Sequence, residues 1–267
     1  MSLRDAVGTV HQRAHDTARI VSLVPSITEL ICDLGLSAQL VGRTGFCVHP
    51  REILKSIPKV GGTKDVDLDR VRALAPTHVV LNIDENLRST ASALALFVPH
   101  LIVTHPMSPL DNPELYRLIG GIFGREHAAE ALCSRFEQAH SALLQAAHAW
   151  PRQSVLYLIW KDPWMTVARD TYISRALAFA GWDTVPAQTA VRYPRIELDE
   201  ALLQGVELVL LASEPYRFRP RHLAELRAQP FMHAPKLALI DGEMTSWYGS
   251  RAIAGAGYLR SLRTARA

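Results

Sequence analysis

Several features that would restrict the class of this protein are scarce or absent in its 267 residues. No segment approaches the roughly 20 consecutive apolar residues that a membrane-spanning helix needs. The three cysteines, Cys32, Cys47 and Cys133, are far apart and form neither a zinc pattern nor a disulfide framework, which favours structural thiols. The net charge is only +3 and the arginines are scattered, so we expect no nucleic acid as partner.

Catalytic and targeting motifs are also missing. The sequence contains no Gly-x-Ser-x-Gly, no Walker loop and no His-Glu-x-x-His, so we expect that the protein is not an enzyme. Residues 1–18 are polar and lack the apolar core of a secretory signal peptide, which predicts a cytoplasmic protein. The alternative is a periplasmic protein from which a native signal has been removed.

Short apolar runs alternate with helical patterns along most of the chain, at 19–24, 40–42 and 100–105 among others, which predicts an α/β fold with parallel sheets. Residues 111–150 have no strand signal but an apolar helical face. Residues 66–81 align without gaps on 196–211, so the two halves look related. We therefore expect two Rossmann-like lobes, 19–107 and 152–264, joined by one long backbone helix within 108–151.

Large aromatic residues are concentrated in the loops that follow the predicted strands. Ligands of open α/β sheets bind at the carboxyl ends of the strands, and clefts between domains are favoured binding sites. The sequence therefore predicts a ligand cleft between the lobes, with walls for a large flat or apolar ligand. The aromatic residues concerned are Phe46, Trp160, Trp164, Tyr216, Phe218, Trp247 and Tyr248.

Three segments carry a resemblance to a known family. They are RIVSLVPSITELICDLGL (19–36), KVGGTKDVDLDRVRALAPTHVVL (59–81) and VLYLIWKDPWMTVARDTYISRALAFAGW (155–182). They resemble the class III periplasmic binding-protein superfamily, the helical-backbone metal receptors, which bind cobalamin, haem or ferric siderophores. The segments LLASEPYRF (210–218) and DGEMTSWYGSR (241–251) are most similar to the cobalamin-binding branch of ABC transporter substrate-binding proteins.

The resemblance implies a function. It predicts non-enzymatic binding of a cobalamin-like corrinoid or a related metal chelate between the lobes, in ABC-type uptake or in a cytosolic relative. It also implies a monomer that requires no cofactor and has an ABC transporter permease as a possible partner. The ligand contacts that it implies are Phe46, Asn82, Trp160, Trp164 and Trp247, and the transporter-docking acids are Glu85 and Glu214.

The residues themselves add further candidate contacts. Tyr216 and Tyr248 extend the aromatic walls. Ser26 is expected to cap the helix after Pro25, and the helix N-terminus there could face an anionic ligand group. Arg251 could bind a ligand carboxylate or phosphate, or could instead pair with Glu243. We expect partly exposed rings at 247 and 248, so that loss of Trp247 weakens binding more than folding.

Alternative functions remain open at the level of the sequence. The aromatic walls would also suit haem or a ferric siderophore, and related receptors bind zinc or manganese. No histidines form a His-x-His pair, and His49 is a weak candidate for an axial metal ligand. The last alternative is an enzyme that acts on a metal chelate.

Overall fold

The computed structural model describes residues 3–232 and 234–266 and divides the chain into two compact units. The first contains the described residues of Met1–Pro106, Leu110–Phe136 and Tyr248–Arg251, and the second those of Met107–Pro109, Glu137–Trp247 and Ala252–Ala267. Each unit has its own four-stranded parallel sheet, so the predicted α/β fold with two parallel sheets is confirmed. Within the described residues, no helix has the length and apolar character needed to cross a bilayer.

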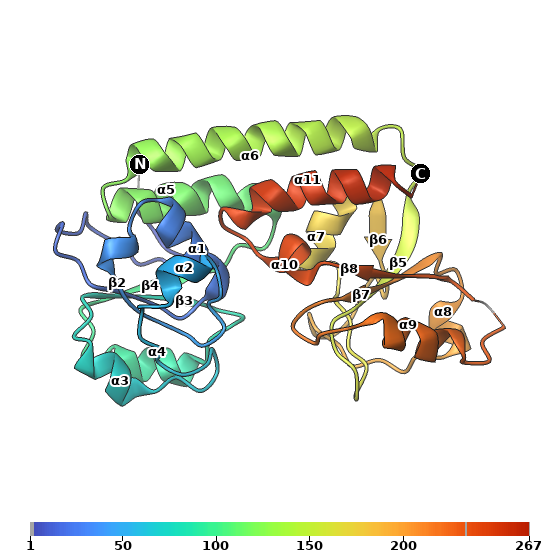
Figure 1. Ribbon diagram of the computed structural model, residues 1–267, viewed down its shortest axis with the longest axis horizontal. Coiled ribbons are helices and arrows are strands. Elements are labelled where there is room, and N and C mark those ends of the chain that lie inside the picture. The colour runs from blue at the N-terminus through green and yellow to red at the C-terminus, as the bar shows by residue number, and fades with distance from the viewer. Residues whose placement is uncertain (1–2, 233, 267) are drawn as a thin grey trace. The chain divides into compact units, whose positions relative to one another are not determined.

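The first sheet has the strand order β2-β1-β3-β4. Figure 1 places α3 and α4 on one face of the sheet and α1 and α5 on the other. The strands are β1 (Ile20–Ser22), β2 (Leu40–Arg43), β3 (His78–Asn82) and β4 (His100–Thr104). The helices between them are α1 (Pro25–Asp33), η1 (Ser37–Gln39), α2 (Arg51–Leu54), α3 (Leu68–Ala73) and α4 (Arg88–Leu94).

Alternation along the strands builds the core of the first unit. Val21 on β1 and Val79 and Leu81 on β3 are buried with Val71 of α3 and Leu94 of α4. Side chains two residues apart in a strand point to the same face, and this core therefore lies between the sheet and α3 and α4. The intervening residues of the strands are also buried, because helices cover the opposite face as well.

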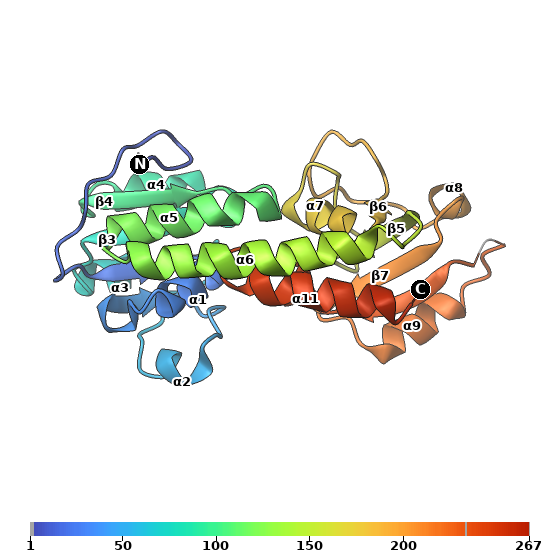
Figure 2. The same cartoon turned by 90° about the horizontal axis from the view of Figure 1, so that it is seen from above.

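After η2 (Pro109–Asp111), the segment between the sheets contains a short helix and then the long helix that was predicted. They are α5 (Asn112–Ile122) and α6 (Glu126–Ala147). Gly124 adopts a φ of +64° between them, a conformation that ends a helix at little cost only for glycine. Figure 2 shows α5 beside the first half of α6, where Arg117 and Glu130 form a bidentate ion pair and Tyr116 contacts Phe136.

The second sheet has the order β6-β5-β7-β8, the same succession as the first. In Figure 1, α8 and α9 lie on the same side of this sheet. The strands are β5 (Gln153–Leu158), β6 (Trp182–Thr184), β7 (Leu208–Ala212) and β8 (Lys236–Ile240). The helices are α7 (Tyr172–Phe179), α8 (Glu200–Leu203), α9 (Pro220–Arg227), α10 (Gly242–Ser246) and α11 (Arg251–Thr264).

The internal sequence repeat corresponds to equivalent elements. The gap-free alignment of 66–81 on 196–211 superimposes the sequence of β3 on that of β7, the third strand in the order of each sheet. The capping acids are not equivalent, however. Asp67 caps α3 by accepting from the amide of Arg70, whereas Asp199, which the alignment pairs with Asp69, caps α8. The alignment therefore matches β3 with β7, whereas the helices before these strands begin at different aligned positions.

Three local expectations need correction. The first helix is not capped by Ser26: its N-cap is Val24, and Ser26 lies inside the first turn. The loop 241–251 contains a short helix, α10, which Asp241 caps through the amide of Met244. Tyr248–Arg251 belong to the first unit, whereas the predicted limits assign them to 152–264.

Candidate functional site

Each unit gathers the loops that follow its strands at the carboxyl edge of its own parallel sheet. In open sheets of this kind ligands bind at that edge. The candidate site residues of the first unit lie in the first turn of α1, in the loop after β2, at the end of β3 and in the loop after it, and in the segment 248–251. Those of the second unit lie in the loops after β5 and β7 and at the end of α10.

The loop after β2 presents an exposed aromatic side chain. Phe46 has 62% of its surface exposed, although large apolar residues are normally buried. Arg43, the last residue of β2, is buried and donates to the carbonyl oxygens of Cys47 (3.2 Å) and Leu54 (2.9 Å). The buried guanidinium therefore ties the end of β2 to the chain that follows Phe46. Sequence reasoning missed Arg43; its position at the end of an apolar run was the only available signal.

The loop after β3 is shaped by two buried amides. Asn82 accepts at Oδ1 from the backbone amides of Asp84 (2.8 Å) and Glu85 (3.3 Å). Asn86, which sequence reasoning missed, accepts from the amide of Asn82 (2.8 Å) and donates to the carbonyl oxygen of Leu23 (3.2 Å). Asn82 thus fixes the conformation of the loop that carries Glu85. Its predicted contact with a ligand remains a prediction.

The acids predicted to dock on a transporter each accept a hydrogen bond from a neighbouring ring. The hydroxyl of Tyr248 donates to the carboxylate of Glu85. The indole Nε1 of Trp247 donates to Glu214 (2.5 Å), which also accepts from Ser246 Oγ (3.1 Å). Burial raises the pKa of Glu214 above its ordinary value. Both rings are buried, with 7% of their surface exposed, whereas partly exposed rings were expected.

The rest of the 248–251 segment is held by polar contacts within the first unit. Arg251 donates from Nε (2.7 Å) and Nη2 (2.6 Å) to the carboxylate of Glu29 on α1. Gly249 has a φ of +75°, and its amide donates to Asn112 Oδ1 (2.7 Å). A Cβ at Gly249 would lie 3.2 Å from the carbonyl oxygen of Ser26, so this position is suited to glycine. Ser26 itself is buried, and a ligand role for Ser26 or Arg251 remains a prediction.

The second unit carries an aromatic cluster after β5 and β7. Trp160, 40% exposed, meets Tyr216 edge-on at a centroid distance of 5.6 Å. Trp164 stacks on Phe218 at 6.1 Å with the rings almost parallel. Sequence reasoning missed the buried His222, whose ring meets both Tyr216 (5.5 Å) and Phe218 (5.4 Å). The predicted residues Trp160, Trp164 and Tyr216 therefore lie in one cluster of rings together with Phe218 and His222.

A bare metal ion needs several ligand side chains that converge on one point. Among residues 3–232 and 234–266, no group of three or more His, Cys, Asp or Glu side chains is arranged to hold one. His49 lies half-buried in the loop after β2. As a single imidazole it could complete the coordination of a metal that a chelate already holds, and this role remains a prediction.

Comparisons with known proteins identify the family. The family described as "Periplasmic binding protein" matches residues 20–232, and the chain belongs to it. The chain is 21% identical over 199 residues to the vitamin B12-binding protein of Pectobacterium carotovorum, covering 74% of this chain and 72% of the relative. The predicted resemblance is thereby confirmed, and members of the family are non-enzymatic substrate-binding proteins.

Solved structures share the fold. The periplasmic haem-binding protein RhuT of Roseiflexus sp. aligns with a TM-score of 0.78 at 21% identity, over 93% of this chain and 97% of that one. The vitamin B12-binding protein BtuF of Vibrio cholerae aligns with a TM-score of 0.78 at 15% identity, over 92% and 96%. At these identities the structures establish the fold alone.

The predicted cytoplasmic location is wrong. The family consists of periplasmic binding proteins, and the chain is also 28% identical over 167 residues to an ABC transporter substrate-binding lipoprotein of Bacillus subtilis. Both findings point to a location outside the cytoplasm. The prediction rested on the polar character of residues 1–18, which does not determine where a substrate-binding protein acts.

Proposed function

We propose that this protein binds a corrinoid or a related metal chelate outside the cytoplasm, as the substrate-binding component of an ABC-type importer. The observation that carries the proposal is the exposure of Phe46 and Trp160 at the carboxyl edges of their sheets. A flat chelate would cover such rings. Each ring contact would add about 0.5–1.5 kcal/mol to the binding free energy, in addition to the contribution of the apolar area that it buries. The curated relatives named vitamin B12-binding proteins support the choice of a corrinoid.

The contacting residues have different roles in this proposal. Phe46 and Trp160 meet the ligand directly, because they retain the largest open aromatic surface. Tyr216 supports Trp160 edge-on, and Trp164 extends the same cluster. Asn82, Ser26, Trp247, Tyr248 and Arg251 contribute mainly by holding the loops, since their polar groups or rings are already engaged or buried.

Docking on a permease by Glu85 and Glu214 is part of the proposal. Both carboxylates accept from aromatic donors within their own units. A permease arginine would therefore bind to acids that are already positioned, and Tyr248 and Trp247 would orient them. Glu85→Gln and Glu214→Gln should each weaken binding to the importer and leave the affinity for the ligand unchanged. Measurement of both affinities for each variant tests this part.

The identity of the ligand is tested by titrating the purified protein with cobalamin and with haem. Binding is monitored by visible absorption spectra and by quenching of tryptophan fluorescence. Phe46→Ala and Trp160→Ala should each weaken binding about tenfold or more, because loss of a stacked ring is worth about 1–3 kcal/mol. Leu96→Ala is the matched control, since Leu96 is 85% exposed and does not belong to the predicted contacts. All three variants should keep the melting temperature of the parent protein within a few degrees.

The outcomes separate the alternatives. Saturable binding of cobalamin that depends on Phe46 and Trp160 supports the proposal. Tight binding of haem or a ferric siderophore without cobalamin binding would replace the corrinoid by another chelate. If no chelate binds while zinc or manganese binds tightly, the proposal is overturned. Chemical turnover of a bound chelate would also overturn it.

A further inference from the structure

Two cavities adjoin in the second unit beneath the segment between α9 and β8. Their volumes are about 110 Å³ and about 300 Å³, and they are called here the inner and the outer cavity. Four residues line both of them: Leu198, Leu226, Gln229 and Phe231. The two cavities are therefore adjacent and share part of their walls.

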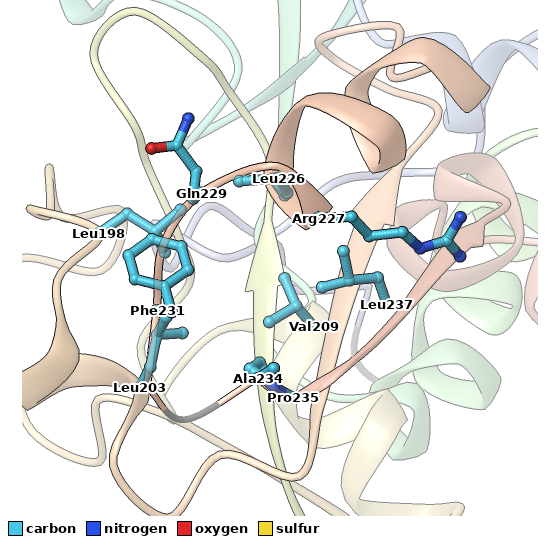
Figure 3. A pocket seen from close by; sticks show the side chains of 10 residues that line it. All are labelled: Leu198, Leu203, Val209, Leu226, Arg227, Gln229, Phe231, Ala234, Pro235 and Leu237. Carbon is cyan, nitrogen blue, oxygen red and sulfur yellow. The ribbon is translucent and has the colours of Figure 1, made fainter.

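The inner cavity is apolar. Besides the shared residues, Leu203 of α8, Val209 of β7 and Leu237 of β8 line it. In Figure 3 the guanidinium of Arg227 and the amide of Gln229 point away from these side chains. An unfilled apolar cavity forfeits dispersion contacts that an apolar guest would restore. A cavity of about 150 Å³ with a similar lining binds benzene or xenon, so the inner cavity suits a group no larger than one ring.

The outer cavity has a polar side. The ammonium of Lys161 contacts the carboxylate of Glu225 and lies 5.8 Å from the centroid of the Trp164 ring. A charged ligand group of either sign would meet one like charge in this pair. A hydroxyl can instead donate to Glu225 and accept from Lys161. The outer cavity therefore favours a neutral group that both donates and accepts.

We propose that the second unit contains a binding site for a small neutral amphiphile that involves neither Phe46 nor Trp160 and shares only Trp164, which lines the outer cavity, with the proposed chelate contacts. Its ring or short alkyl group occupies the inner cavity, and its hydroxyl lies between Lys161 and Glu225 in the outer cavity. Arg227, Gln229 and Ala234, which line the inner cavity, are exposed, so the guest would enter beside them. Because the site needs no metal chelate, its test does not depend on whether the proposed function is correct.

Phenol is a suitable probe, with toluene as the matched molecule that lacks the hydroxyl. In methyl-labelled protein, phenol should shift the resonances of Leu203 and Val209 saturably. Ala234→Leu, which adds volume to the inner cavity wall, should weaken phenol binding about tenfold or more. Ala224→Leu makes the same change at another exposed position, on α9, that lines neither cavity, and it should leave binding unchanged.

The hydroxyl assignment is tested by Glu225→Leu. The parent protein should bind phenol more tightly than toluene, and this preference should disappear in the variant. Absence of saturable shifts with both probes would overturn the proposal. Equal weakening by Ala234→Leu and Ala224→Leu would also overturn it, because the shifts would then not report on the inner cavity. Thermal unfolding of each variant shows whether it is folded before its binding is compared.

Discussion

The indole nitrogen of Trp247 donates a hydrogen bond to the carboxylate of Glu214, with a donor–acceptor distance of 2.5 Å. The next residue, Tyr248, donates its hydroxyl to Glu85. Trp247 and Glu214 belong to the second unit, and Tyr248 and Glu85 to the first. Buried Trp and Tyr side chains usually find partners for their polar ends. The adjacent aromatic residues after α10 thus anchor the chain to a different unit on each side of one peptide bond.

The first prediction concerns Trp247. Trp247→Phe keeps an aromatic ring but removes the donor to Glu214, so the free energy of unfolding should fall by about 1–3 kcal/mol. Trp247→Ala should lower it by about 3–5 kcal/mol, because the ring is buried. Urea unfolding measures both changes. Trp160→Phe at an exposed position is the control, and equal stability of Trp247→Phe and the parent would contradict the prediction.

The second prediction concerns Glu214 and pH. Burial raises the pKa of Glu214 above its ordinary value of 4.5, so the folded state retains the proton to higher pH than the unfolded state. Stability should therefore fall as the pH rises from 4.5 through the raised pKa. Glu214→Gln cannot ionise and keeps an oxygen acceptor for the indole. The stability of this variant relative to the parent should rise over the same interval, and a constant difference would refute the assignment.

The third prediction concerns His78 at the start of β3. Burial, followed by the neighbouring His100, lowers the pKa of His78 from 6.5 to about 4, and the two rings stack at a centroid distance of 4.7 Å. The unfolded state then binds more protons between these values, so stability should be lost as the pH falls from 6.5 to about 4. The loss should be about 3–4 kcal/mol at most, at about 1.4 kcal/mol per pKa unit.

His78→Phe keeps a ring in the stack but cannot be protonated. Its stability should therefore change less than that of the parent over the same acidic interval, in urea unfolding at several pH values. An equivalent change at the exposed His148 should leave the pH dependence as it is. Identical pH profiles for His78→Phe and the parent would show that other groups control the acid response.

The fourth prediction concerns the ion pair between Arg251 and Glu29. Both side chains are largely buried, with 12% and 15% of their surface exposed, and the pair is bidentate. Arg251→Met leaves the carboxylate of Glu29 without this partner, and the loss should approach the roughly 3–5 kcal/mol seen when one member of a buried pair is removed. The double variant Arg251→Met, Glu29→Gln should recover part of the loss. Additive losses would mean that the two side chains are not coupled.

Much of the fold could be predicted from the sequence because its signals are local. Apolar runs such as 19–24, which ends at Pro25, define most of the strands, and the repeat between 66–81 and 196–211 identifies equivalent units. The strand β6 was missed, because Trp182–Thr184 is only three residues long and has no alternating pattern. The helix α10 was missed because its five residues are too few to establish helical periodicity.

The candidate site could be predicted only in part. Rings after strands are visible in the sequence, and the structure groups Trp160, Trp164 and Tyr216 in one cluster. The buried polar residues that hold the loops, Arg43 and Asn86, have partners that are distant in the sequence. No local pattern distinguishes such residues from exposed polar ones.

The sequence by itself determined the succession of strands and helices, the presence of two parallel-sheet units and the family, because these follow from local periodicity and short motifs. Only the tertiary structure decided which rings are open and which are buried. Phe46 and Trp247 both follow strands, yet one is exposed and the other donates to Glu214. The difference arises from side chains that the fold brings together from distant positions, and the free energy of these contacts depends on the packing of the folded chain.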